Sequence, residues 1–366
     1  MKIGILTFHC AVNYGAVLQA YALQEILRSL GHEVYVIDYR PDYLTEAYCP
    51  FKFYPNSSSS MFHRIKVFFR ACLAALICNK RNRSFKTFIK NRLNLYKLDL
   101  YDKQNTFDAF VFGSDQIWNP EITKTIDNVF IGNFSAAYGK YRIAYAASIG
   151  SVKNLRDSDI SSFEYIVKNF TAISVREQSL KVFFKERFNK EATVVLDPVL
   201  LAGVSIFKKI ATKKKVDKPY LLLVQLGRNV SVSLYTEKIA QKMGLQLVEV
   251  ISWGESIKNR NLQQCLSPED FLGYIKGASY VMTTSFHGTV FSILFRKNFN
   301  VVRCGTRVDE RAFSLLQSLG LEKQMCSIDD IFTMNPKIDY SLIDSKLQNL
   351  RDSSLYYLTQ AMMMNR

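Results

Sequence analysis

The sequence predicts an α/β protein built from two Rossmann-like domains that face a cleft. Short apolar strands alternate with helical segments along most of the chain, and strands connected in this way form parallel sheets. A basic, polar stretch at 208–218 separates two such series. The length of 366 residues suits two domains of roughly 150 residues or more each.

The first series begins with a predicted strand at 2–7, a loop at 8–15 and a helix at 16–30 that Gly31 ends. A strand at 33–38 completes a β-loop-α-β start with short connections, which is typical of a parallel sheet. Further units are predicted after an irregular stretch at 42–60, with strands at 107–112, 142–147, 172–175 and 193–196 and helices at 158–169 and 180–188.

Residues 61–92 are a basic insertion in the first domain. They include nine Lys or Arg residues and no Asp or Glu, with apolar residues interleaved, so we expect one or two amphipathic helices. Two interpretations remain open. The segment could bind an anionic membrane surface, at about 1 kcal/mol per basic residue. Alternatively, it is a solvated basic face whose apolar stripe packs on the sheet.

The second series has predicted strands at 220–225, 245–251, 280–283 and 299–302 and helices at 231–243, 268–275, 288–295 and 309–319. The resulting domains are 1–207 and 219–339, joined by the linker 208–218. A final helix is expected within 340–366, where packing back on the first domain is open.

Composition limits the classes of function. The net charge of +16 favours phosphates, anionic lipid or nucleic acid as partners, but no recognised nucleic-acid module is present, so we expect no nucleic acid. Seven scattered cysteines without C-x-x-C spacing and four histidines predict neither a disulfide framework nor a metal site. The N-terminus does not read as a signal peptide and no apolar run reaches about 18 residues. We therefore expect a cytoplasmic protein, with peripheral attachment to the inner face of the plasma membrane as an extension.

The most informative turn follows the predicted strand at 280–283. Ser285 and His287 lie where a helix begins at Gly288, and the free N–H groups of a helix start favour an anion. The imidazole of His287 adds a titratable group beside that anion. The alternative is a structural histidine that caps the helix.

Three other loops end predicted strands with polar residues. Asn13 and Gly15 precede the first helix, where they could contact a phosphate or sugar or form a simple N-cap. Arg176, at the end of the strand at 172–175, could clamp a phosphate or carboxylate. It could equally pair with Glu177 or bridge the domains.

The segment 112–120 offers several hydrogen-bonding groups at one strand end. Ser114, Asp115 and Gln116 would face the cleft, Asp115 could accept a proton from a hydroxyl, and Trp118 would stack on a sugar ring. The alternative is an Asx-type turn with Trp118 in the core.

These loops together resemble the polysaccharide pyruvyl transferase family. The matching segments occur in the family's order from residue 1 to about residue 320, at 13–23, 112–118, 142–150, 174–177, 196–198 and 285–289. The resemblance implies a GT-B-like pair of domains, in which residues 1–207 form the acceptor side and residues 219–339 the donor side. It also implies transfer of a pyruvyl group from phosphoenolpyruvate to a sugar of a cell-surface polysaccharide, or of its lipid-linked precursor, as a cyclic ketal, without a metal or other cofactor.

The family's donor site maps onto this chain with one departure. The resemblance implies that Arg176 holds the donor, but relatives have an Arg-Leu-His-like turn where this chain has Ser285-Phe286-His287. Arg303, Arg307 or Arg311 would compensate for the missing arginine. We assign His287 as the acid or phosphate-side donor, Arg176 as the clamp and Asp115 as the base on the acceptor.

Two other functions stay open. A GT-B glycosyltransferase using a nucleotide sugar would need a ribose-binding acidic residue, and none can be assigned. A non-catalytic, membrane-associated glycan-assembly protein would keep the fold, and the serine at 285 favours it.

Overall fold

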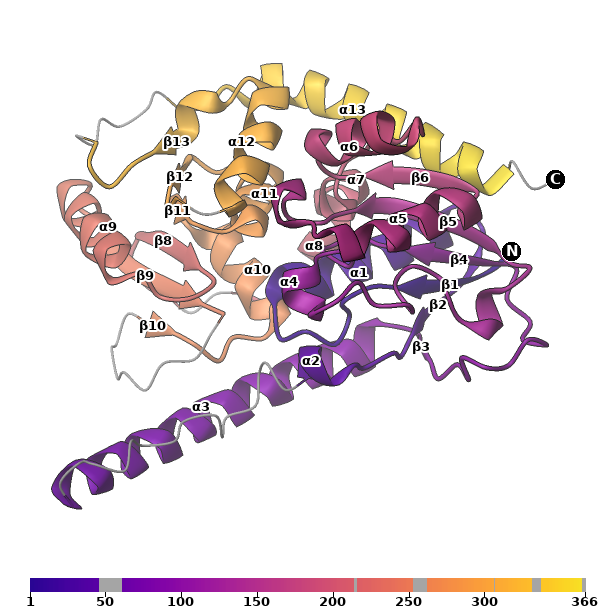
Figure 1. Cartoon of the computed structure of the whole chain (residues 1–366). Helices are drawn as coiled ribbons and strands as arrows, with labels where there is room; N and C mark the ends of the chain where they lie inside the picture. The colour runs from indigo at the N-terminus through magenta and orange to yellow at the C-terminus, as the bar shows by residue number, and fades with distance from the viewer. Residues whose placement is uncertain (46–60, 214–215, 253–261, 306, 331–336, 364–366) are drawn as a thin grey trace.

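The computed structural model describes residues 1–45, 61–213, 216–252, 262–305, 307–330 and 337–363. Two sheets lie side by side, with helices packed around each (Figure 1). All paired strands in both sheets run parallel. The prediction of two Rossmann-like α/β domains is therefore confirmed.

The first sheet has seven strands in the order β3-β2-β1-β4-β5-β6-β7. Its central strands are buried on both faces, which explains their nearly continuous apolar sequences. The strand bounds are β1 Lys2–Leu6, β2 Glu33–Ile37, β3 Leu95–Tyr96, β4 Ala109–Phe112, β5 Tyr141–Ala147, β6 Ala172–Val175 and β7 Thr193–Val194.

Helices of this half connect the strands and cover the sheet. The first begins at the position that its cap dictates, because the side chain of Asn13 accepts hydrogen bonds from the backbone of Gly15 and Ala16. The helices are α1 Tyr14–Ser29, α2 Asp42–Thr45, α3 Met61–Arg92, α4 Pro120–Thr123, α5 Asp157–Asn169, α6 Gln178–Phe188 and α7 Pro198–Ala202, with the 3-10 helices η2 Ser135–Ala137 and η3 Val152–Asn154.

The second sheet has six strands in the order β10-β9-β8-β11-β12-β13. Its strands are β8 Tyr220–Gln225, β9 Gln246–Ile251, β10 Leu262–Gln263, β11 Tyr280–Thr283, β12 Phe299–Val302 and β13 Met325–Cys326. The helices around it are α8 Val204–Ile210, α9 Val230–Lys242, α10 Pro268–Gly277, α11 Phe286–Leu294 and α12 Arg307–Leu319, with the 3-10 helix η4 Glu322–Gln324. The predicted linker 208–218 thus begins inside α8.

The two halves share one hydrophobic core. A single cluster of buried residues includes Val17 of α1, Phe207 of α8 and Phe291 of α11. Tyr14 stacks on Phe271 of α10 with ring centroids 4.4 Å apart, and its hydroxyl donates to the carbonyl of Leu266 over 3.3 Å. This packing brings the N-terminus of α1 to the N-terminus of α11.

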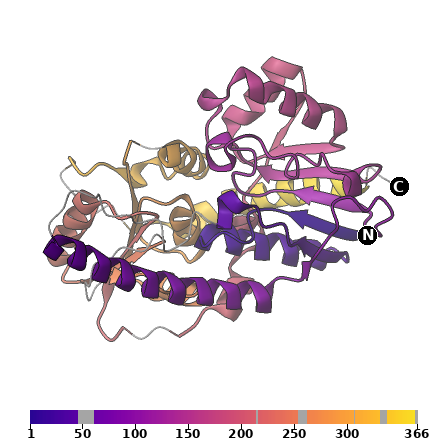
Figure 2. The ribbon, with the colours of Figure 1, turned by 60° about the horizontal axis from the view of Figure 1, so that its bottom comes forward.

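The basic insertion is the single helix α3, which runs along one side of the molecule across both halves (Figure 2). Its C-terminal part contributes Phe85, Phe88 and Ile89 to the core. Arg81 donates to the carbonyl of Ser252, and Arg92 lies 3.4 Å from Glu269. Among the described residues, no helix combines the length and apolar character that crossing a bilayer requires.

A second helix crosses both halves on the opposite side, namely α13 Tyr340–Met363 (Figures 1 and 2). At its start, the hydroxyl of Tyr340 donates to the carbonyl of Lys297 over 2.6 Å. Further along, Ser354 accepts a 3.0 Å hydrogen bond from the backbone of Leu196, and Tyr357 donates to the carbonyl of Ala144 over 3.4 Å. The last helix therefore contacts both domains.

Candidate anion site between the two domains

The polar residues singled out from the sequence meet where β4 and β6 end and α11 begins. β4 stops at Phe112, and Gly113 follows with φ +120°. A Cβ atom there would lie 2.2 Å from the carbonyl oxygen of Tyr145, so only glycine fits. Asp115 is in the left-handed region at φ 76°, a conformation that is costly outside glycine and concentrates at functional sites.

Asp197 is the centre of the cluster and is 2% exposed. Its Oδ2 lies 3.2 Å from Nη1 of Arg176 and 3.5 Å from Nε2 of His287, and it accepts a 3.3 Å hydrogen bond from the hydroxyl of Ser114. Its Oδ1 caps α7 by accepting from the backbone of Val199 over 2.9 Å. Burial alone would raise the pKa of Asp197, but His287 and Arg176 hold that pKa well below its ordinary value.

The guanidinium of Arg176 is buried and only partly paired. Its Nε lies 3.3 Å from Oε1 of Glu177, and its Cζ lies 4.7 Å from the ring centroid of Phe286. Nη2 is buried without a hydrogen-bond partner among the described residues. Burial would lower the pKa of Arg176, yet the carboxylates of Glu177, Asp197 and Asp115 raise it above its ordinary value.

Arg311 of α12 lies against the same ring. Its guanidinium is 5.7 Å from the centroid of Phe286, and the residue is 8% exposed. Within the part of the chain that the structure describes, Nε has no hydrogen-bond partner. Burial and the positive charge of Arg176 lower the pKa of Arg311 to about 10, against the opposite effect of nearby carboxylates that include Glu177 and Asp115.

His287 projects from the first turn of α11 onto the first domain. Ser285 caps this helix, since its hydroxyl accepts a 3.4 Å hydrogen bond from the backbone of Gly288. A Cβ atom on Gly15 would lie only 2.0 Å from Nδ1 of His287. The glycine at the start of α1 therefore makes room for the imidazole of the other domain.

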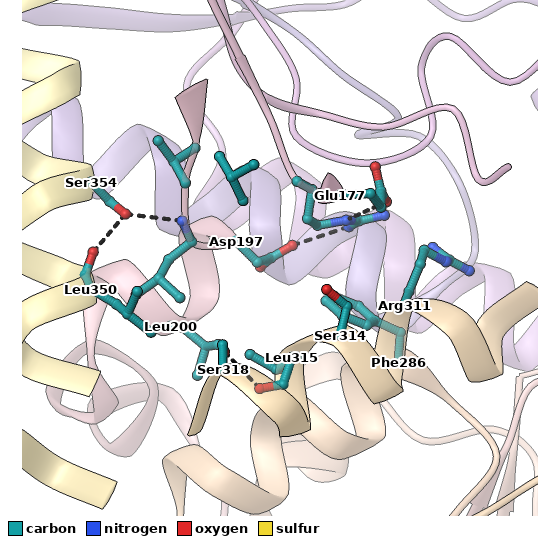
Figure 3. Close-up of a pocket in the computed structure, with 14 residues that line it drawn as sticks. Glu177, Asp197, Leu200, Phe286, Arg311, Ser314, Leu315, Ser318, Leu350 and Ser354 are labelled. Atoms are coloured by element: carbon teal, nitrogen blue, oxygen red, sulfur yellow. Dashed lines mark hydrogen bonds and ion pairs between the residues drawn. The ribbon is translucent and has the colours of Figure 1, made fainter. Parts of the chain in front are cut away.

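A cavity of about 100 Å³ opens beside these groups (Figure 3). Pockets for drug-sized ligands usually measure about 300–1,000 Å³, so this one suits a small ligand. Leu350 and Ser354 of α13 close one side of it. Its charged lining residues are Arg176, Glu177, Asp197 and Arg311. Figure 3 shows Glu177, Asp197 and Arg311 away from the side that Leu350 and Ser354 close, with Phe286 beside Arg311.

The structure places the remaining predicted residues as follows. Asn13 serves as the N-cap of α1, with Oδ1 accepting from Gly15 over 2.9 Å. Gln116 accepts a 2.8 Å hydrogen bond from Asn119, so it is engaged within its own loop. Arg303 is exposed, and the side chain of Arg307 lies outside the described residues. Of the two compensating arginines whose side chains the structure describes, Arg303 and Arg311, Arg311 lines the cavity.

The expected role of Trp118 in stacking on a sugar is wrong. Its side chain is fully buried, and its indole N–H donates to the carbonyl of Phe130 over 3.0 Å. The ring packs edge-on against three phenylalanines, Phe163, Phe170 and Phe184. No face remains for a ligand, so the alternative of a core tryptophan holds.

Sequence reasoning did not place Asp197 and Glu177 in the site. The motif Leu196-Asp197-Pro198 looks like an ordinary helix cap, and Asp197 does cap α7. For Glu177 the sequence predicts at most a salt bridge with Arg176. Within the described residues, no group of three or more His, Cys, Asp or Glu side chains is arranged to hold a metal ion.

Comparisons with known proteins complete the description. The family model for polysaccharide pyruvyl transferase matches residues 13–305. No curated protein sequence matches the chain.

Several solved structures resemble the fold at low sequence identity. UDP-GlcNAc 2-epimerase from Neisseria meningitidis bound to UDP-GlcNAc has 11% identity and a TM-score of 0.47, over 99% of this chain and 94% of that one. S. aureus MnaA with UDP has 12% identity and a TM-score of 0.46, over 97% and 89%. The glycosyltransferase SnogD from Streptomyces nogalater has 10% identity and a TM-score of 0.44, over 100% and 98%.

Proposed function

Because the chain belongs to the polysaccharide pyruvyl transferase family, we propose that it transfers a pyruvyl group from phosphoenolpyruvate to a sugar and forms a pyruvate ketal. The acceptor is a glycan of a cell-surface polysaccharide, either as the polymer or as a lipid-linked precursor. The basic helix α3 would keep the enzyme near an anionic membrane on its cytoplasmic side.

The observation that carries this proposal is the pair of buried guanidinium groups beside one small cavity. Arg176 and Arg311 both pack on Phe286, and each has a buried nitrogen without a partner among the described residues. A buried charge that lacks a partner is costly, so an anionic ligand would offset that cost. Phosphoenolpyruvate carries a phosphate and a carboxylate, which two arginines can bind together.

The remaining groups fit the chemistry of pyruvyl transfer. Protonation of the donor's CH2 carbon creates an oxocarbenium-like centre, a sugar hydroxyl attacks it, phosphate leaves and a second hydroxyl closes the ketal. His287 is assigned to the proton donation, with Asp197 orienting its ring. Asp115 is assigned to accept a proton from an acceptor hydroxyl. Arg176 and Arg311 stabilise the negative charge on the donor and on the departing phosphate.

The site suggests how the chain manages without the arginine that relatives have at position 285. The side chain of Ser285 carries no charge, and its hydroxyl caps α11. Arg311 reaches the ring of Phe286, the residue that follows Ser285, from a different helix. We assign Arg311 as the replacement.

The test is release of inorganic phosphate from phosphoenolpyruvate in the presence of a panel of hexose nitrophenyl glycosides, with mass analysis of the products for the pyruvyl ketal. We expect His287→Ala and Arg311→Gln to lose most of the turnover. Arg296→Gln is the matched control, because Arg296 is an exposed arginine of the same domain that pairs with Asp344.

Phosphate release without a pyruvylated product would contradict transfer to a sugar. Tight binding of UDP or GDP with no turnover of phosphoenolpyruvate would favour a nucleotide-sugar glycosyltransferase instead. If His287→Ala or Arg311→Gln turns over as fast as the control Arg296→Gln, the substituted residue does not have the role assigned to it.

A further inference from the structure

Glu177 occupies an unusual position for a buried carboxylate. It is the N-cap residue of α6, yet its side chain makes no capping hydrogen bond. The residue is 6% exposed and is among those that line the cavity, where Arg176 pairs with both Glu177 and Asp197.

The two oxygens of this carboxylate are in different situations. Oε1 accepts a 2.5 Å hydrogen bond from the hydroxyl of Ser148 and lies 3.3 Å from Nε of Arg176. Oε2 is buried and has no hydrogen-bond partner among the described residues. Since a buried carboxylate oxygen without a donor is costly, Oε2 requires a hydrogen-bond donor that a ligand in the cavity would supply.

The overall reaction proposed above also needs more proton acceptors than Asp115 alone. Ketal formation uses two hydroxyl groups, and each loses its proton when its oxygen bonds to the former C2 of the donor. One proton ends on the donor's CH2 carbon, which becomes a methyl group, and the other ends on the departing phosphate. The C2–O bond to phosphate is the bond that breaks, and no oxidant or reductant is involved.

We propose that Oε2 of Glu177 accepts the proton of one of the two acceptor hydroxyls. This inference rests on the proposed pyruvyl transfer, in which Asp115 serves the other hydroxyl. The proton then passes to the phosphate oxygen as phosphate leaves, which restores the carboxylate. Ser148 and Arg176 hold Oε1 and so fix the direction of Oε2.

A purely structural role for Glu177 would be to orient Arg176. The substitution Glu177→Gln separates the two roles, because the amide oxygen can still accept from Ser148 and Arg176 while the proton-accepting oxygen is lost. Glu186→Gln is the matched control. It makes the same change of side chain at an exposed glutamate of α6, the helix that begins directly after Glu177.

We expect Glu177→Gln to lower kcat for phosphate release by about 10²- to 10⁴-fold, the usual contribution of general acid–base catalysis. The KM for phosphoenolpyruvate should not rise by more than about threefold. Inorganic phosphate, measured by calorimetry, should bind at least as tightly as in wild type, because the substitution removes a negative charge beside Arg176. Glu186→Gln should retain the kcat of wild type. In Glu177→Ala, added formate should restore part of the lost turnover, which no structural role would predict.

Turnover of Glu177→Gln within about tenfold of wild type would overturn the inference. So would a loss of kcat that is matched by weakened phosphate binding, because that result assigns Glu177 to the orientation of Arg176. If Glu177→Gln does not fold, the absence of formate rescue in Glu177→Ala would overturn it. A wild-type protein that releases no phosphate overturns both proposals, whereas an active wild type with any of the results above overturns this one alone.

Discussion

The contact between Gly15 and His287 provides a sharp test of how the two domains form one site. In Gly15→Ala, the new Cβ would lie 2.0 Å from Nδ1, 2.3 Å from Cγ and 2.7 Å from Cε1 of the imidazole. The ring would have to move by about 1.4 Å before the closest pair reached 3.4 Å, the start of ordinary van der Waals contact. Such movement would also separate Nε2 from Asp197, now 3.5 Å away.

The size of the effect follows from two opposing terms. Overpacking of this kind typically costs about 1–3 kcal/mol. Gly15 has no positive φ and lies in the first turn of α1, so alanine suits the backbone there and should contribute up to about 1 kcal/mol of stability. We therefore expect Gly15→Ala to destabilise the wild-type protein but to be neutral or stabilising in His287→Ala, where the ring is gone.

The assay is a double-mutant cycle of thermal unfolding on the wild type, both single variants and the double variant. For domains of 150–250 residues, 1 kcal/mol corresponds to about 2–4 °C in Tm, so the change of sign is measurable. Turnover should be lower than in wild type both in Gly15→Ala and in His287→Ala. An equal cost of Gly15→Ala in both backgrounds would refute the reasoning, because the clash would then not be with the imidazole.

Three further predictions concern two carboxylates and one core tryptophan. Asp197→Asn should cost about 3–5 kcal/mol of stability by leaving Arg176 with one carboxylate partner fewer, and yet bind inorganic phosphate more tightly, as calorimetry would measure. A hydrogen bond from His9 lowers the pKa of Asp38 from 3.8 to about 2, so this carboxylate stabilises the fold above pH 3.8 and loses that effect as pH falls through 2. The urea midpoint of Asp38→Asn should therefore lie below that of wild type at pH 7 and meet it near pH 2. Trp118→Ala should lower stability by about 3–5 kcal/mol, as removal of a core aromatic does, whereas a solvent-facing tryptophan would change the melting temperature little.

Each of these predictions has a clear contrary result. Phosphate binding that weakens in Asp197→Asn would mean that this carboxylate positions Arg176 more than it neutralises it. A difference between Asp38→Asn and wild type that persists unchanged at pH 2 would exclude the ionised Asp38 as its source. Wild-type stability of Trp118→Ala would contradict the core position of the indole.

The fold could be predicted because its signals are local. Strands such as β1, β4 and β8 are short apolar runs bounded by polar loops, and helices such as α1 begin at a capping residue and end near a glycine. The positions of Ser114, Arg176 and His287 at strand ends also follow from this alternation, because parallel strands end on one edge of the sheet.

The detailed site could not be predicted in the same way, because it depends on which strand ends are neighbours. The meeting of Asp197 with His287 joins two sheets and cannot be recognised in a helix-capping Asp-Pro pair. Arg311 lies on the amphipathic helix α12, where an arginine usually faces solvent, but in the folded protein it is buried and packs against Phe286. Trp118 is expected in the site but lies in the core. A tryptophan after a polar turn has the same sequence signature in either place.

The path of α13 has a consequence for the order of the chain. Leu358, Ala361 and Met362 belong to the shared hydrophobic core, and Met1 lies beside Met362 and Met363 along a surface groove. The N-terminus and the C-terminal end of α13 are thus neighbours in space (Figure 1). The first domain is discontinuous in sequence, since the chain leaves it after α7 and returns only with its last helix. Residues 1–207 expressed alone would expose the apolar surface that α13 covers. A circular permutant that joins the present ends and begins near residue 216 would encode each domain as one uninterrupted stretch.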